Sequence, residues 1–224
     1  MKIFFLGTGA ADWPLERPAD YKEFRRLSSA VIDDTLLIDP GPQVLEALET
    51  YGKNNIQYII NTHSHSDHYS EKTKQALCNR GAEFVKLQPG EQATLGKYSI
   101  TAYKANHGTR TDAVHFMITD GEKTLFYGLD GAWLLYDEVQ AIKNCKPDLA
   151  VFDATIGNCP GDYRIFEHNN LNMVLEMKQT LNDYIGQVCI SHMAMTLHTD
   201  HETLSKTMAK HGILTACDGF EIHL

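Results

Sequence analysis

Six consecutive residues, His63 to His68, constrain this chain more than any other segment. They read His-Ser-His-Ser-Asp-His, although only 11 of the 224 residues are histidine. Imidazole nitrogen and carboxylate oxygen are ligands of Zn²⁺, Mn²⁺ and Fe²⁺, and four donors exceed what one ion with an open position usually takes from a single segment. We therefore predict a site for two metal ions. A fold that uses this segment must bring further donors to it from elsewhere in the chain.

The charge and length of the chain limit what such a site can serve. The sequence has 20 Lys and Arg against 29 Asp and Glu, a formal net charge of −9. This balance repels polyanions, so we expect a small-molecule substrate rather than extended nucleic acid. A length of 224 residues suits one domain, residues 1–224, with one buried core. The sequence leaves the oligomeric state open, a homodimer included.

Cysteine usage and hydropathy indicate a compartment. The five cysteines are odd in number and contain no C-x-x-C pair, which argues against a disulfide framework or a cysteine zinc site. No apolar stretch approaches the roughly 20 residues of a membrane span. The first apolar run, Ile3–Leu6, is shorter than the roughly 7–15 residues of a signal-peptide core. We expect a cytoplasmic protein that is not associated with a membrane.

Strands and helices are expected to alternate along most of the chain. Apolar runs predict strands at Lys2–Leu6, Ser29–Ile32, Leu36–Asp39, Ile56–Ile60, Phe84–Leu87, Tyr98–Lys104, Val114–Thr119, Thr124–Tyr127, Leu149–Phe152 and Gln187–Ile190. Helical periodicity predicts helices at Pro42–Tyr51, Glu71–Asn79, Ala132–Lys143, Asn170–Asn182 and Thr199–Lys210. Asp33-Asp34 and Asp120-Gly121 are expected turns, and Ile213–Leu224 a terminal hairpin turning at Asp218-Gly219. This order predicts an α/β fold with helices flanking a two-sheet core.

Three isolated residues share a topological position with the histidine-rich segment. His107, Asp130 and His192 each follow a predicted strand. Catalytic side chains in α/β folds gather at strand ends, so this shared position favours a ligand over a surface residue. His198 and His201 lie at the start of a predicted helix beyond the site, and we expect them to bind no metal.

These motifs together resemble the metallo-β-lactamase superfamily. The resemblance rests on the H-x-H-x-D-H segment, on the three later donors, and on the segments Gly7-Thr8-Gly9, Leu37-Ile38-Asp39-Pro40-Gly41 and Asp218-Gly219-Phe220-Glu221-Ile222. It implies an αββα four-layer sandwich. It also implies two metal sites with one bridging carboxylate: the first holds His63, His65 and His107, the second Asp67, His68 and His192, and Asp130 bridges them.

Two further segments, Glu167–Leu171 and Ile190–Met193, resemble the phosphonate-pathway phosphoribosyl cyclic phosphodiesterases of that superfamily. The resemblance implies that His168 lies beside the metals as a proton donor; a helix-capping residue exposed to water is the alternative. The cysteine-rich zinc site of that group is absent from Ala10–Leu27. The substrate is therefore left open.

The expected activity is metal-dependent hydrolysis of a small or cyclic phosphodiester by a metal-bridging hydroxide. Asp67 would orient that nucleophile or accept its proton, and His168 would protonate the leaving alkoxide. Two divalent ions, Zn²⁺ or Mn²⁺, suit the mixed shell of imidazole and carboxylate.

Other activities of the same fold remain alternatives. They are hydrolysis of a carboxylic ester, lactone or thioester, and a ribonuclease Z-like nuclease, although no counterpart of the long tRNA-binding arm is evident. A flavodiiron oxidoreductase is disfavoured because His65 stands where that group has Glu. A non-catalytic binding protein is disfavoured because such proteins usually lose donors, and all seven are present here.

Overall fold

The predicted strands form two sheets in the computed structural model, which describes residues 1–224. The first sheet has the order β13-β1-β2-β3-β4-β5, and its strands are β1 Lys2–Gly7, β2 Ser29–Ile32, β3 Leu36–Ile38, β4 Tyr58–Ile60, β5 Glu83–Val85 and β13 Glu221–His223. The second has the order β12-β11-β10-β9-β8-β7-β6, and its strands are β6 Gln92–Leu95, β7 Tyr98–Lys104, β8 Val114–Thr119, β9 Thr124–Gly128, β10 Leu149–Asp153, β11 Gln187–Ser191 and β12 Ile213–Thr215.

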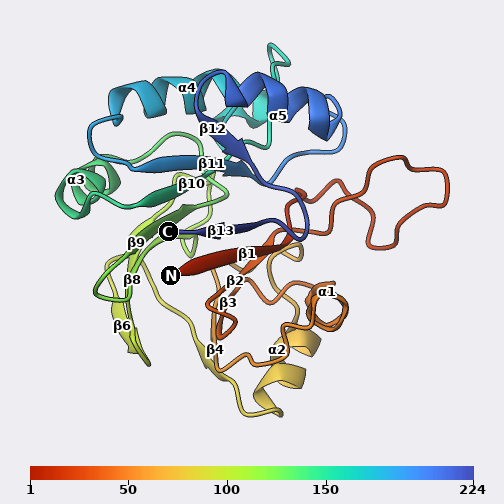
Figure 1. Cartoon of the computed structure of the whole chain (residues 1–224), viewed down its shortest axis with the longest axis vertical. Coiled ribbons are helices and arrows are strands. Elements are labelled where there is room, and N and C mark those ends of the chain that lie inside the picture. Colours follow the sequence, from red (N-terminus) through yellow and green to blue (C-terminus); the bar gives the residue numbers. More distant parts are fainter.

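Helices cover the outer face of each sheet (Figure 1). They are α1 Val44–Tyr51, α2 Glu71–Cys78, α3 Tyr136–Cys145, α4 Leu171–Thr180 and α5 His201–Ala209, with a short 3₁₀ turn, η1, at Tyr163–Phe166. α1 and α2 lie beside the first sheet, whereas α4 and α5 lie across the second. No helix is both long enough and apolar enough to cross a membrane. The order helix, sheet, sheet, helix confirms the expected four-layer α/β sandwich.

Alternation along β1 shows how the sequence specifies the layers. Ile3 and Phe5 belong to the apolar cluster between the two sheets, where they are joined by Tyr98 and Phe116 of the second sheet. Phe4 and Leu6 point the other way, into the cluster formed with α1 and α2. Successive strand residues face opposite sides, so a run that is apolar at every position buries both faces.

The predicted terminal hairpin is wrong. Although Gly219 has a φ of +86°, as a turn requires, the strands on either side of it join different sheets. β12 pairs in parallel with β11, whereas β13 pairs antiparallel with β1. The Asp218-Gly219 turn therefore carries the chain from the second sheet to the first, because each strand finds its hydrogen-bond partners elsewhere.

Two other predictions need correction. The helix expected from Ala132 begins at Tyr136, because Trp133 has a left-handed backbone and the Glu138 carboxylate accepts the Leu135 amide hydrogen at 2.7 Å. The strand β6 was not predicted, since its sequence, Gln-Ala-Thr-Leu, has little apolar character. The remaining predicted strands and helices are present, with ends that differ by up to a few residues.

The crossing strand β13 gives a test of the fold. Ile222 lies in the inter-sheet cluster and is 6% exposed, whereas His223 on the same strand is exposed. Ile222→Ala should lower the free energy of unfolding by about 2–4 kcal/mol, the usual cost of truncating a buried aliphatic side chain. His223→Ala should change it by less than about 0.5 kcal/mol. Urea unfolding followed by circular dichroism measures both, and equal effects would contradict the crossing.

Candidate metal centre

The structure brings the predicted donors to one edge of the molecule, although they come from both sheets. Groups of side chains close enough to share an ion are His63, His65 and His107; Asp67, His68, Asp130 and His192; and Asp130, Asp153, His168 and His192. Within each group the candidate ligand atoms lie within 4.8 Å of one another. All seven predicted donors are included; the first two groups follow the division that the resemblance implied, with Asp130 grouped with the second.

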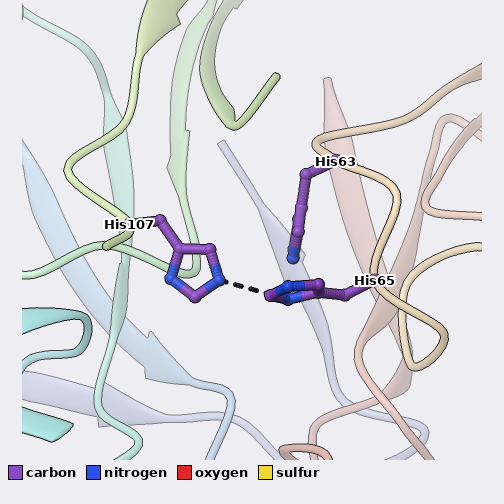
Figure 2. Close-up of side chains that lie close together, drawn as sticks. All are labelled: His63, His65 and His107. Atoms are coloured by element: carbon purple, nitrogen blue, oxygen red, sulfur yellow. Dashed lines mark hydrogen bonds between the residues drawn. The ribbon is translucent and has the colours of Figure 1, made fainter. Parts of the chain in front are cut away.

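The first group is made by the loop after β4 and the loop after β7. Figure 2 shows the three imidazoles of His63, His65 and His107 converging from two chain segments. His107 Nε2 lies 3.2 Å from His65 Nδ1. The ring centroids of His63 and His65 are 4.6 Å apart. Each ring thus turns one nitrogen toward a common point.

Asp130 lies between the two groups. One carboxylate oxygen, Oδ2, is 3.2 Å from His63 Nε2 and 2.7 Å from His68 Nε2. The other, Oδ1, is 3.0 Å from His192 Nε2. Since His63 belongs to the first group and the other two histidines to the second, the carboxylate occupies the place that a bridging ligand would take.

Four of the imidazoles are oriented through their other nitrogen. Nδ1 of His63 lies 3.0 Å from Thr62 Oγ1, and Nδ1 of His192 lies 2.7 Å from Thr155 Oγ1. Nδ1 of His68 lies 2.8 Å from Asp39 Oδ2, and Nδ1 of His107 lies 3.2 Å from the Glu167 carbonyl oxygen. A partner at Nδ1 fixes the ring and leaves Nε2 free to act as a ligand. This is the arrangement that metal-ligating histidines normally show.

Two buried carboxylates, Asp39 and Asp153, support the donors, and neither was predicted to have a role at the site. Asp39, after β3, is fully buried and accepts hydrogen bonds from the Thr62 amide at 2.7 Å and the Asn61 side chain at 3.0 Å. Asp153 ends β10 and accepts the Asp130 amide hydrogen at 3.1 Å. Asp153 could have been found, because it follows an apolar strand just as Asp130 and His192 do.

Backbone conformation sets these side chains apart from the surrounding strands. Asp39, Asp130 and His192 have φ values of +62°, +60° and +63°, in the left-handed region that residues other than glycine seldom occupy. Each lies just past the end of a strand. Such conformations cost energy and cluster at functional sites. The three turns therefore orient their side chains at a cost in backbone energy.

His168 lies beside the second group, as the resemblance implied. Its Nδ1 is 2.8 Å from Asp153 Oδ2 and 3.4 Å from Asp130 Oδ1, and its ring stacks on His192 with centroids 5.5 Å apart. Helix capping is done instead by Asn170, which accepts the Met173 amide hydrogen. Because Nδ1 of His168 is paired with Asp153, Nε2 is the ring nitrogen left for other partners, and the residue lines the cavity described below.

The ionisable groups of the cluster differ in the direction in which their pKa values are shifted. Burial, followed by the charge of His68, lowers the pKa of His63 to about 2. Burial also opposes the charging of His168, but the Asp153 and Asp130 carboxylates outweigh it and raise its pKa to about 9. Burial opposes ionisation of Asp130 as well, yet His192 and His68 hold its pKa well below the usual range. The Asp130 carboxylate therefore stays ionised among the imidazoles of the cluster.

The donors fit divalent cations. The buried atoms His63 Nε2 and Asp130 Oδ1 have no hydrogen-bond partner. Orphaned polar atoms are costly in a protein interior unless an ion or other ligand satisfies them. Imidazole nitrogens and carboxylate oxygens are the set that Zn²⁺ and Mn²⁺ accept. The structure thus contains His and Asp clusters suited to binding divalent metal.

The other histidines lie outside the centre. His198 Nε2 donates to the Ala154 carbonyl oxygen at 2.7 Å, and His201 Nδ1 lies 3.1 Å from the Arg25 guanidinium. His115 is buried against Glu138 with its Nδ1 2.5 Å from the carboxylate. None belongs to a group of donors close enough to share an ion.

A cavity of about 230 Å³ opens onto the cluster. Its wall includes His65, Asp67, His107, Asp130, His168 and His192, together with Ala10, Ala11, Asp12, Thr155, Arg164, Glu167 and Ala194. A space of this size beside the donors suits a small molecule.

Comparison with known proteins agrees with this geometry. The sequence profile described as the metallo-beta-lactamase superfamily matches residues 28–71, which include the histidine-rich segment. No curated protein sequence matches the chain.

Solved structures resemble the chain over its full length. A diphosphatase from the PhnP family has a TM-score of 0.76 at 18% identity, covering 100% of this chain and 97% of its own. The metallo-beta-lactamase fold protein YhfI from Bacillus subtilis has a TM-score of 0.74 at 19% identity, covering 99% and 98%. Zn²⁺-bound PqqB from Methylobacterium extorquens has a TM-score of 0.77 at 15% identity, covering 100% of both chains. At these identities the likeness establishes the fold, which is that of metallo-β-lactamase fold proteins, and the superfamily profile matches the one segment that contains the histidine-rich motif.

Proposed function

We propose that this protein is a binuclear metal-dependent phosphodiesterase acting on a small or cyclic phosphodiester. One observation carries the proposal: the carboxylate of Asp130 lies between two groups of donors while the His168–Asp153 pair stands beside it. Two cations and an acid are the parts that displacement at phosphorus requires when the leaving group is an alcohol. The PhnP-family diphosphatase, which shares the fold, acts at phosphorus according to its name.

Bound divalent cations would supply a nucleophile at neutral pH and neutralise charge that develops on the phosphoryl oxygens. His63, His65 and His107 would hold one ion, and Asp67, His68 and His192 the other, with Asp130 shared. Asp67 Oδ2 lies 3.4 Å from His68 Nε2 and lines the cavity. That position also lets the carboxylate orient a nucleophile or take its proton.

The proposed acid is His168. Asp153 accepts a hydrogen bond from its Nδ1 and favours the imidazolium form, which leaves the proton on Nε2 facing the cavity. The same carboxylate also accepts hydrogen bonds from the Asp130 amide and the Asn169 amide. Asp153 thereby fixes the positions of His168 and Asp130 relative to each other. The proton donor would then be held close to the leaving oxygen.

Metal binding should stabilise the fold. Each ion that binds only the native state at 100 times its dissociation constant adds about 2.7 kcal/mol, so two ions should raise Tm by about 11–22 °C with Zn²⁺ or Mn²⁺ after stripping. Asp130→Asn should lose most of this rise, whereas Asp183→Asn, on the exposed surface, should keep it. Native mass spectrometry should count two ions per chain in the wild type. One ion, or no thermal shift, would contradict a binuclear centre.

The same pair of variants tests the activity. Metal-loaded wild type should hydrolyse bis(p-nitrophenyl) phosphate, and Asp130→Asn should lose more than the roughly 10–100-fold typical of residues that only support a ligand. Asp183→Asn should match wild type. Absence of turnover with two ions bound would rule out this phosphodiesterase and favour an ester, lactone or thioester as substrate.

The role of His168 depends on the leaving group. His168→Ala should lower the rate on an alkyl or cyclic ribosyl phosphodiester by about 10²–10⁴-fold, the scale of general acid catalysis. It should have little effect on the p-nitrophenyl diester, because phenolate leaves without a proton. His211→Ala, an exposed histidine, is the control. Equal losses on both substrates would show that His168 supports the site without donating a proton.

A further inference from the structure

A buried ion pair lies behind the metal centre and has no part in the chemistry proposed above. His115 on β8 is 1% exposed and Glu138 on α3 is 0% exposed. Nδ1 of His115 lies 2.5 Å from Oε1 of Glu138. Apolar residues of similar volume often stabilise a core as well as a buried ion pair does, or better. Stability alone therefore does not explain why two ionisable side chains occupy this position.

The imidazole of His115 packs under the turn that carries Asp130. A Cβ atom on Gly131 would lie 2.7 Å from Cε1 and 2.8 Å from Nε2 of His115, closer than packed side chains come. A Cβ atom on Gly128 would lie 3.5 Å from Nδ1 of the same ring. Nε2 has no hydrogen-bond partner, so its contact with the turn is one of packing. The ring thus fills the space beneath both ends of the turn of residues 128–131.

Three contacts fix the ring and the segment that follows the turn. The ring of Phe126 meets that of His115 edge-on, with centroids 5.9 Å apart. Oε2 of Glu138 accepts the Leu135 amide hydrogen at 2.7 Å, while Oε1 of the same carboxylate holds His115. The segment 131–135 is therefore held at its start by the imidazole and at its end by the carboxylate.

Asp130 depends on such a support. Its φ of +60° is one that residues other than glycine seldom adopt, and such a backbone persists only where its surroundings enforce it. Its two carboxylate oxygens also lie against imidazoles of both donor groups, His63 on one side and His192 on the other. Groups at a site of this kind have to be held within about 0.5 Å of their working positions. A fixed ring under the turn meets this requirement.

We propose that His115 and Glu138 form a positioning pair, which holds the turn so that Asp130 can serve as a metal ligand shared by both donor groups. Neither residue belongs to a group of side chains close enough to share an ion, so the pair acts through the backbone of the turn. The inference rests on the binuclear centre of the proposed function, but not on its substrate.

General stabilisation of the second sheet is the other role open to the pair. In that case a variant would unfold more easily, while the turn and its metal affinity would stay unchanged in the molecules that remain folded. If the pair positions Asp130, the turn would loosen and metal binding would weaken even in a variant that is fully folded.

Hydrogen exchange on the metal-free protein tests the support directly. His115→Asn keeps an N–H near the Nδ1 position for Glu138 but removes the atoms that pack on Gly131. The Asp130 and Ala132 amides are hydrogen-bonded in the native turn. Relative to the amides of β10, both should exchange about tenfold faster or more in this variant, because the turn opens more often.

Two further variants keep this measurement decisive. Ile222→Ala removes packing elsewhere in the core and should not raise the exchange ratio between the turn and β10. Should His115→Asn fail to fold, Glu138→Gln replaces it. Glutamine keeps an oxygen for the Leu135 amide but loses the charge that holds His115, so the same changes are expected at a smaller size.

Metal binding provides a second readout. The affinity of the centre for Mn²⁺ should fall by about 10–100-fold in His115→Asn, the usual effect of changing a residue behind a ligand. Two Mn²⁺ ions that share a carboxylate are magnetically coupled, and the coupling in the electron paramagnetic resonance spectrum should weaken as well. His211→Asn removes the same side chain from an exposed position and should behave as wild type.

The two readouts separate this inference from the proposed activity. Faster exchange at the turn together with weaker Mn²⁺ binding supports the inference even if wild type hydrolyses no phosphodiester, in which case only the activity fails. Unchanged exchange at the turn, or Mn²⁺ affinity and coupling equal to those of wild type, overturns it. A wild type that binds a single ion also overturns it, because Asp130 would then have no second ion to share.

Discussion

The buried carboxylate of Asp130 is the interaction on which the rest of the centre depends. It is 2% exposed and touches imidazoles from the loops after β4 and β11. An ionised carboxylate removed from water costs several kcal/mol unless positive or polar groups surround it. The two sheets provide these groups by ending their strands at the same edge. The centre therefore requires the complete sandwich, because neither sheet alone supplies enough donors.

A second layer of acidic residues makes the arrangement precise. Asp39 follows a strand of the first sheet and Asp153 ends a strand of the second, yet each is fully buried and accepts hydrogen bonds from at least one backbone amide and from a threonine hydroxyl. Backbone amides move little, so these carboxylates are rigid supports for His68 and His168. The turns that carry His68 and His168 are therefore held by hydrogen bonds within the protein.

Features that depend on neighbouring residues could be predicted from the sequence, whereas features that depend on distant parts of the chain could not. The histidine-rich segment and the donors after strands were recognisable because ligand type and strand ends are local features. Asp153 was missed although it directly follows the predicted strand Leu149–Phe152, a position of the same kind as those of Asp130 and His192. The turn at Asp218-Gly219 was recognised, but the pairing of β12 and β13 was not, because a turn signal does not state which sheet each strand joins.

The crossing of the chain between β12 and β13 has a consequence for how the protein forms during synthesis. β1 is synthesised long before β13, and its edge pairs with β13, from Lys2 with His223 to Phe4 with Glu221. Translation proceeds at about 5–20 residues per second, so β1 waits roughly 10–45 s for this partner. During that time one edge of the first sheet is unpaired, and such edges invite association with other chains. Newly made chains would therefore benefit from a chaperone until residues 221–223 have left the ribosome.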